Sequence, residues 1–399
     1  MPTALSAVLC AALLLMVSMG VRQSTGLFIS PINTSTGLGI VSLSFALAIG
    51  QFMWGAIQPV AGAVADRYGP GRVLAAGLIV LALGCVLTTF VDSTFGMTMT
   101  LGVLAAAGSG AGSFSVLIGA ASRRLDSAQR GQAAGIINAG GSLGQFVFAP
   151  LAQKLIASVG WMGAMYAMAA AALAALPLAR ALRAREPHPQ HAAGGDGGLR
   201  RAVGDAMRDR SYLLLHAGFF TCGFHIAFLI THLPGEVGLC GLPAEVASGA
   251  LALIGLANIF GSLLAGWAVG RWRSKMILFW MYASRAVLVL IYLASPRTEW
   301  TFYLFAIGLG VTWLATVPPT AGVVGKLFGT RYLATLFGLT LLSHQTGGFF
   351  GAWLGGLALE HRGNYQWMWY ADAALAAAAA LVNLPIREAR VVRPVAPAT

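Results

Sequence analysis

The chain has 399 residues, of which 57% are hydrophobic and only 10% are charged. Soluble domains carry about 25% charged residues, so this composition excludes an ordinary water-soluble protein. Lysine and arginine outnumber aspartate and glutamate by 25 to 13, which gives a formal net charge of +12 at pH 7. A basic excess is typical of nucleic-acid binding, but its placement along this chain indicates a membrane orientation signal and no nucleic-acid partner.

Apolar stretches follow one another along almost the whole chain. A helix needs about 20 apolar residues to cross the roughly 30 Å hydrocarbon core of a bilayer. The sequence therefore predicts an all-α membrane protein with twelve transmembrane helices. The predicted spans cover residues 5–30, 40–64, 72–91, 95–121, 131–155, 161–182, 211–235, 244–270, 275–295, 300–326, 332–358 and 366–386.

One charged segment, rich in proline and glycine, interrupts this pattern and divides the spans six and six. We interpret it as a linker between two halves. The predicted organisation is an N-terminal six-helix bundle over residues 1–182, the linker over 183–210, a C-terminal six-helix bundle over 211–386 and a tail over 387–399. The first span lacks a charged leader and a small-residue cleavage site, so we expect a retained helix rather than a signal peptide.

The positive charges concentrate on one side of the predicted membrane. Of the 25 lysines and arginines, three fall in outer segments and two within spans, which leaves twenty in segments on the side of the N-terminus. The three outer residues are Lys154, Arg297 and Arg362, and the two embedded ones are Arg22 and Arg285. Cytoplasmic loops carry such an excess, so both termini are predicted to be cytoplasmic.

The sequence carries no sign of an enzyme. The four cysteines are scattered without ligand spacing or a disulfide framework, and a role as small apolar fillers fits them. No nucleophile and base pair, metal-ligand spacing or nucleotide-binding glycine loop stands out. We therefore expect no catalytic residue, no cofactor and no metal. The cysteines are Cys10, Cys85, Cys222 and Cys240.

The segment GAVADRYGPGR at residues 62–72 joins the second and third predicted spans. A weaker copy, GWAVGR at 266–271, follows the second span of the other half at an offset of 204 residues. Both strings occupy the same place in the helix count, which indicates two related halves. Transporters with duplicated halves hold their substrate near the bilayer midplane between them.

The first of these segments resembles the signature G-x-x-x-D-R-x-G-x-x-R of the major facilitator superfamily, and the resemblance covers the whole chain. It implies two pseudo-symmetric six-helix bundles that rock about a central site. It also implies a conformational latch, in which a carboxylate and arginines at helix ends make a link that can break and re-form. The latch would be formed by Asp66, Arg67 and Arg72.

Three further segments resemble the bacterial branch related to monocarboxylate transporters and oxalate:formate antiporters, whose members move small organic acids. They are VRQSTGLFISPI at 21–32, WLATVPPTAG at 313–322 and HQTGGFFGAWLGG at 344–356. The aspartate and arginine that members carry in the eighth helix are absent from the corresponding residues 258–262.

Arg22 is the first candidate for substrate binding, because it lies well inside the first span. An arginine at the centre of a membrane helix costs about 2.5–3.5 kcal/mol on insertion scales, so it usually faces water or a partner. Its planar fork donates two parallel hydrogen bonds to a carboxylate. We expect a carboxylate clamp, with Gln23 adding a hydrogen bond. The alternative is an arginine that pairs with backbone carbonyls or extends to the outer surface.

Two histidines could serve both substrate binding and proton coupling, since histidine titrates near physiological pH. His225 lies near the middle of the seventh span, one residue from the position that the 204-residue offset pairs with Arg22, and His344 lies in the eleventh. Arg285, in the ninth span, is either a cavity ligand or a structural bridge to Asp372. Hydrogen-bonded packing is the alternative for each histidine.

Trp54 and Trp313 are predicted apolar walls of the cavity, with ordinary packing as the alternative. Apart from Asp372 no acidic residue lies in the middle of a span, whereas Arg22 and Arg285 are embedded. A positive cavity attracts anions.

The sequence thus predicts a secondary transporter that moves a small organic anion by alternating access, as a monomer in the lipid bilayer of a bacterial inner membrane. Proton-coupled symport is the leading coupling. Anion exchange of the oxalate:formate type follows, because it needs no titrating residue. A drug or metabolite exporter and a non-transporting membrane receptor remain as alternatives.

Overall fold

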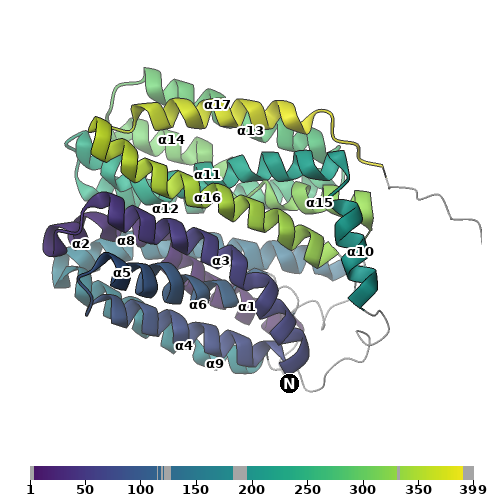
Figure 1. Cartoon of the computed structure of the whole chain (residues 1–399), viewed down its shortest axis with the longest axis horizontal. Helices are drawn as coiled ribbons and strands as arrows, with labels where there is room; N and C mark the ends of the chain where they lie inside the picture. The colour runs from purple at the N-terminus through teal and green to yellow at the C-terminus, as the bar shows by residue number, and fades with distance from the viewer. Residues whose placement is uncertain are drawn as a thin grey trace, which may run out of the picture.

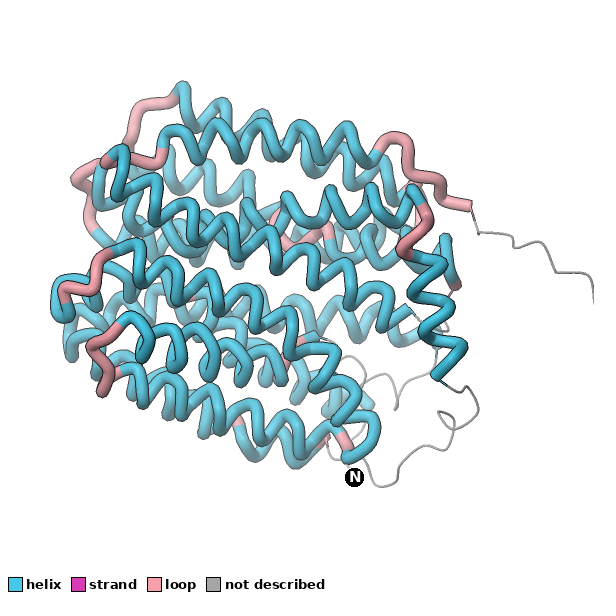
Figure 2. Tube along the Cα trace, in the orientation of Figure 1, coloured by secondary structure: helices cyan, strands magenta, loops and turns pink. Residues whose placement is uncertain are grey.

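The computed structural model describes residues 4–114, 116–117, 120, 127–182, 196–329 and 333–389. Within these ranges the chain is almost entirely helical and contains no strand (Figure 2). Lipid offers no hydrogen-bond partner to the backbone, so an apolar chain of this kind satisfies its N–H and C=O groups within helices.

The first half contains long helices and several short segments that continue them. The elements are α1 (Ala4–Gln23), η1 (Thr25–Phe28), α2 (Ile29–Thr36), α3 (Ile40–Tyr68), α4 (Pro70–Thr88), α5 (Thr94–Met97), η2 (Thr98–Ala105), α6 (Ala106–Ala111), α8 (Ser127–Ala174) and α9 (Leu176–Ala181). The segment η2 is a π-helical stretch that connects α5 to α6. The long helix α8 covers the fifth predicted span and the first part of the sixth. The two spans are separated at Gly160, whose backbone has φ 74° and is not helical.

The second half follows a short helix in the linker. Its elements are α10 (Asp196–Ala206), α11 (Arg210–Leu239), α12 (Ala244–Val269), α13 (Ser274–Ala294), α14 (Glu299–Thr312), α15 (Val317–Phe328), α16 (Leu333–Arg362) and α17 (Gln366–Asn383). Eight helices or helix series among the described residues are long and apolar enough to cross a membrane. Further helices lie at the remaining predicted spans. They are the series α5 to α6, the second part of α8, α16 and α17, so a helix lies at each of the twelve predicted positions.

The helices lie side by side with their axes nearly aligned (Figure 1). The first half, purple to blue-teal, occupies the lower part of the view, and the second half, teal to yellow, occupies the upper part. The halves touch closely through small residues. A Cβ on Gly255 of α12 would lie 2.7 Å from the Ser142 carbonyl oxygen of α8, and one on Gly356 of α16 would lie 2.6 Å from Ser44 of α3. Such close backbone approach drives helix association in lipid.

The tenth predicted span is broken in its middle. Helix α14 ends at Thr312, residues 313–316 are not helical, and α15 begins at Val317 with two prolines after it. Proline has no N–H and disfavours a helical residue before it, so the sequence cannot carry one helix through this point. The break exposes backbone groups that need partners. The Leu314 N–H donates to Asn258 Oδ1 of α12 at 2.9 Å.

The 62–72 segment forms the turn between α3 and α4. Gly69, with φ 90°, separates the two helices, and Pro70 opens α4. A positive φ at this point favours glycine, and proline at the first helical position costs no hydrogen bond. Arg72 is exposed in the first turn of α4. The side chains of Asp66 and Arg67 lie outside the part of the chain that the structure describes, so the latch stays a prediction.

Candidate functional site

Arg22 lies near the end of α1, where α3 and α16 meet it. Its side chain is half-buried, and its Nη2 donates to Gln51 Oε1 of α3 and reaches Gln345 Oε1 of α16 at 3.5 Å. The guanidinium carbon is 4.3 Å from the centre of the Trp54 ring, a cation–π distance. Arg22 therefore contacts both halves of the molecule, and both hydrogen-bond partners are neutral amides.

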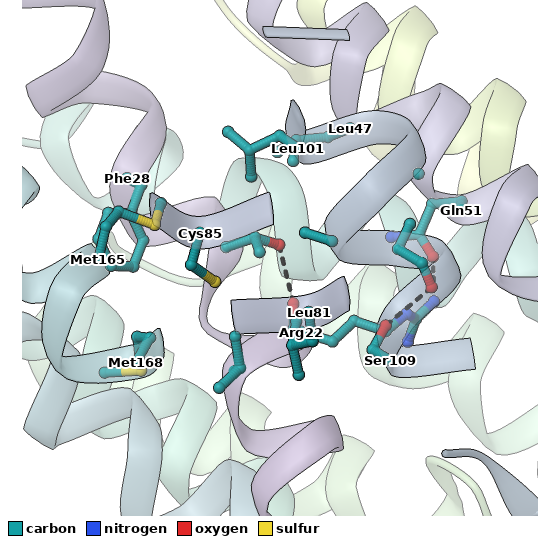
Figure 3. A pocket seen from close by; sticks show the side chains of 15 residues that line it. Arg22, Phe28, Leu47, Gln51, Leu81, Cys85, Leu101, Ser109, Met165 and Met168 are labelled. Carbon is teal, nitrogen blue, oxygen red and sulfur yellow. Dashed lines mark hydrogen bonds between the residues drawn. The ribbon is translucent and has the colours of Figure 1, made fainter. Parts of the chain in front are cut away.

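A cavity of about 40 Å³ opens beside this guanidinium within the first half. Figure 3 shows the Arg22 guanidinium beside the Gln51 side chain, with sulfur and hydrocarbon groups further along the wall. The lining includes Arg22, Gln51 and Ser109 as polar side chains and Phe28, Leu47, Leu81, Cys85, Leu101, Met165 and Met168 as apolar or sulfur-bearing ones. About 10–15 Å³ suffices for one water molecule, so this cavity has room for water beside a lone cation.

Gln23 lies on a different side of α1 from its neighbour. It is 1% exposed, and its Nε2 donates to Gln145 Oε1 of α8 at 2.9 Å. Consecutive residues of a helix do not face the same way, which explains the difference. In this structure Gln23 joins α1 to α8 and does not contact Arg22's partners.

His225 and Asp372 form a buried pair between α11 and α17. The His225 Nδ1 is hydrogen-bonded to Asp372 Oδ2, and neither residue is more than 2% exposed. His225 Nε2 and Asp372 Oδ1 have no hydrogen-bond partner among the described residues. The Trp313 ring lies 6.0 Å from the His225 ring. The pair thus keeps one free nitrogen and one free oxygen, at which a proton could be gained or lost.

Arg285 of α13 is 1% exposed and binds the break between α14 and α15. Its Nε donates to Thr312 Oγ1 at 3.1 Å, and its Nη2 donates to the Trp313 carbonyl at 2.6 Å and to the Thr312 carbonyl. Carbonyls at a helix end lack intrahelical partners and carry partial negative charge, so a guanidinium stabilises them. The fourth bond, from Nη1, goes to Cys222 Sγ at 3.1 Å.

The predicted bridge between Arg285 and Asp372 is therefore wrong. Asp372 pairs with His225 instead, and Arg285 is fully occupied by the carbonyls that the break sets free. The sequence shows Pro318 and Pro319 but not which side chain satisfies the backbone groups before them. That assignment depends on how α13 packs against the break.

His344 lies in α16 next to Gln345. Its Nδ1 is 3.1 Å from Gln345 Nε2, and its ring is 4.7 Å from that of Phe219. Trp313 is fully buried within the break, and Trp54 is 3% exposed beneath Arg22. Both tryptophans are thus packed walls next to the polar groups. Gln51 and Gln345 are site residues that sequence reasoning missed, because a neutral amide in a span usually bonds another helix.

These polar residues form one connected path across the molecule. Arg285 contacts Cys222 of α11, whose sulfur also lies against the His344 side chain. His344 bonds Gln345, and Gln345 accepts from Arg22. Cys222 and His225 stand three residues apart and so share a face of α11, which places the histidine pair beside the same path.

The path is positively charged. Among the described residues no carboxylate lies within ion-pair distance of Arg22 or Arg285. No group of three histidine, cysteine, aspartate or glutamate side chains in the described ranges could hold a metal ion. The arrangement can attract an anion to Arg22, and it can hold or release a proton at the pair of His225 and Asp372.

Comparisons with known proteins find similarity over most of the chain. The family model of the Major Facilitator Superfamily matches residues 11–352. Monocarboxylate transporter 13 of Rattus norvegicus is 27% identical over 375 residues, which cover 92% of this chain and 85% of that protein. The oxalate:formate antiporter of Oxalobacter formigenes is 25% identical over 90% of this chain and 85% of its own length. An uncharacterized transporter of Bacillus subtilis, YcxA, is 22% identical over 86% and 85% respectively.

Proposed function

Because the chain belongs to the Major Facilitator Superfamily and is a multi-pass membrane transporter rather than an enzyme, we propose that it moves a small organic anion, of the monocarboxylate class, by alternating access. The observation that carries the proposal is Arg22, a half-buried guanidinium that lies beside a cavity and whose side-chain hydrogen bonds, among the described residues, go to neutral amides. The substrates named by the rat and Oxalobacter relatives are small carboxylates and agree with a cation at this place.

The chemistry of Arg22 suits a carboxylate. A guanidinium inside a membrane protein is costly unless it meets a partner, and a carboxylate accepts two parallel hydrogen bonds from its planar fork. An anion would displace the weaker amide acceptors of Gln51 and Gln345. The apolar and sulfur-bearing wall next to Arg22 would then face the short hydrocarbon part of the substrate.

Binding at Arg22 would also change how the halves hold each other. Gln51 belongs to the first half and Gln345 to the second, so a carboxylate that takes over the guanidinium loosens a contact across the interface. A ligand shifts a conformational equilibrium only through different interactions with the two states. Loss of this contact supplies such a difference. Asp66, Arg67 and Arg72 would act as the latch of the same cycle.

We place the coupled proton at the pair of His225 and Asp372, with His344 as the second site. The pair is buried and keeps a free ring nitrogen and a free carboxylate oxygen. Anion exchange, as the printed name of the Oxalobacter relative describes, is the alternative coupling. An exporter of cationic drugs is less consistent, because the mid-span carboxylate is already bonded to histidine.

We further propose that the protein acts as a monomer in the lipid bilayer of a bacterial inner membrane, with both termini in the cytoplasm. Its two rocking units are residues 1–182 and 211–386, joined by residues 183–210 and followed by the tail 387–399. No nucleic acid takes part. A non-transporting receptor would bind the anion at Arg22 without carrying it across.

The test is uptake by proteoliposomes of labelled lactate, pyruvate, oxalate and formate, with and without an inward proton gradient. We expect uptake of at least one of them, increased by the gradient. Uptake of none would overturn the proposal, and uptake that needs internal anion but no gradient would replace symport by exchange. Arg22→Ala should abolish uptake, whereas the matched control Arg362→Ala, at the exposed end of α16, should not.

A further inference from the structure

In the part of the chain that the structure describes, no carboxylate pairs with the charge of Arg285. The guanidinium is 1% exposed, and its oxygen partners are a hydroxyl and two backbone carbonyls. The mid-span carboxylate Asp372 is bonded to His225. A buried charge is very costly unless an opposite charge or strong dipoles balance it. The end of α14 supplies only part of an elementary charge.

Cys222 is the acidic group that remains in contact with this guanidinium. Its sulfur lies 3.1 Å from Arg285 Nη1 and 3.4 Å from Thr316 Oγ1, and the thiol is 1% exposed. The His344 ring and the Tyr282 side chain also lie near this sulfur. Groups with N–H or O–H therefore surround Cys222 from α13, α16 and the break in the tenth span.

The tautomer of His344 supports this arrangement. The Gln345 amide nitrogen can only donate, so His344 Nδ1 accepts and the ring proton lies on Nε2. That leaves an N–H for the Cys222 sulfur. A neutral thiol is a weak acceptor that could give its own proton to Thr316 Oγ1, whereas a thiolate accepts several bonds and donates none.

We propose that Cys222 is a thiolate and forms a buried ion pair with Arg285 at the break of the tenth span. The pair neutralises Arg285 and leaves Arg22 as the unbalanced cation of the polar path. The titratable groups that face Cys222 are Arg285 and Tyr282 of α13 and His344 of α16. His225 lies one turn further along α11 and pairs with Asp372 of α17. Because the thiolate is the nucleophilic form of cysteine, the rate of reaction with a soft electrophile reports on this charge.

The chain contains its own control. Cys85 of α4 is 3% exposed and lines the cavity beside Arg22 among hydrocarbon and methionine side chains. No hydrogen-bond donor is recorded at its sulfur among the described residues. Cys85 and Cys222 are thus two embedded cysteines of similar burial, and only one of them has a guanidinium in contact.

Two single-cysteine proteins test the proposal in detergent micelles. One keeps Cys222 and the other keeps Cys85, with alanine at the remaining cysteines. The probe is methyl methanethiosulfonate: the thiolate attacks the sulfenyl sulfur, a disulfide to the methylthio group forms, and methanesulfinate leaves with the electron pair. Intact-mass spectrometry follows the rate between about pH 5.5 and 8, a range in which an ordinary thiol gains thiolate about tenfold per pH unit.

We expect the Cys222 rate to change less than about threefold over this range, and the Cys85 rate to rise about tenfold per pH unit. Arg285→Met in the Cys222 protein should restore the steep rise. A Cys222 rate that rises as steeply as that of Cys85 would overturn the ion pair.

A second measurement decides the matter if burial prevents any reaction. Cys222→Ser is close to isosteric and removes the negative charge. It should lower the melting temperature when Arg285 is present and change it little in the Arg285→Met background. Equal shifts in both backgrounds would show a neutral thiol. Neither measurement uses a transport substrate, so this inference and the proposed anion transport can fail independently.

Discussion

The two embedded arginines have the same side chain but opposite surroundings. Arg22, in the first half, is half-buried beside a cavity and holds two neutral amides, one at the long distance of 3.5 Å. Arg285, in the second half, is 1% exposed and donates four bonds, three of them to the broken helix. In the proposed function an anion displaces the amide partners of the first arginine, whereas the second bonds backbone carbonyls of the fold.

This difference shows what decides the role of a charge within a membrane protein. Both residues lie within predicted spans, so that placement alone does not separate them. What separates them is whether the backbone nearby needs a donor. The break at residues 313–316 frees carbonyls that only a strong donor satisfies, and Arg285 reaches them from α13. A break also follows Arg22, since α1 ends at Gln23, but the Arg22 guanidinium is turned to the amides of Gln51 and Gln345 and not to carbonyls of that break.

Replacing Arg22 should produce the largest effect on transport. Removing one partner of a buried charge-assisted contact costs about 2–5 kcal/mol, which corresponds to a loss of roughly 30-fold to several thousand-fold in affinity. We expect Arg22→Ala to abolish measurable uptake in proteoliposomes while the melting temperature stays close to that of the native protein. Arg22→Lys should recover little, because an ammonium lacks the planar fork. Native uptake by Arg22→Ala would remove the distinction between the two arginines.

Replacing Arg285 should instead damage the fold. Arg285→Met leaves the carbonyls of Thr312 and Trp313 without their donor, and each buried unsatisfied group costs about 1–3 kcal/mol. The expected result is a lower melting temperature and a lower yield of folded protein, measured by thermal scanning in detergent. Among the molecules that remain folded, the KM for the anion should change less than in Arg22→Lys. A stable Arg285→Met protein with a greatly increased KM would make Arg285 a ligand after all.

Replacing a member of the pair of His225 and Asp372 should have an effect of intermediate size. The pair lies in the second half, like Arg285, but keeps two atoms without a hydrogen-bond partner among the described residues. Asp372→Asn retains the shape but cannot exchange a proton. We expect uptake driven by the proton gradient to fall at least about tenfold, while exchange of internal for external anion continues. His344→Gln is the comparison variant, since its ring is engaged with Gln345. Unchanged gradient-driven uptake in Asp372→Asn would move the proton elsewhere.

Much of the fold could be predicted from hydropathy alone, because the bilayer sets the length of each span and the prolines after Val317 indicate where the tenth span breaks. The candidate site could be predicted only by residue type. His225 and Asp372 lie 147 residues apart, and no pattern shows that their helices bring them together. The sequence alone indicates an apolar filler at Cys222. Its contact with Arg285 depends on the packing of α11 against α13, which the sequence does not show. Long-range pairing of this kind follows from tertiary packing, which a single sequence does not display.

The smallest effect is expected from Glu388, which follows α17 at the end of the second half and bonds both α13 and α15. Its carboxylate accepts from the Lys275 N–H, in the first turn of α13, at 2.6 Å and from Lys326 Nζ of α15 at 2.8 Å. Burial opposes ionisation of Glu388, but these donors prevail and hold its pKa below the ordinary value. Such a carboxylate stabilises the fold above its unfolded pKa of about 4.3, and the stabilisation is lost as pH falls through the lower folded value.

Glu388→Gln should therefore lower the stability by about 1 kcal/mol near neutral pH, a typical net value for one such contact. The loss relative to the native protein should begin to shrink as the pH falls below the unfolded pKa of about 4.3, and it should vanish below the lower folded pKa, where the native carboxylate is protonated as well. Melting temperatures of both proteins across this range measure the difference, and the KM for the anion should stay unchanged because Arg22 belongs to the other half. A difference in melting temperature that grows on acidification would contradict the assigned role. An altered KM would show that the contacts of Glu388 in the second half affect substrate binding at Arg22.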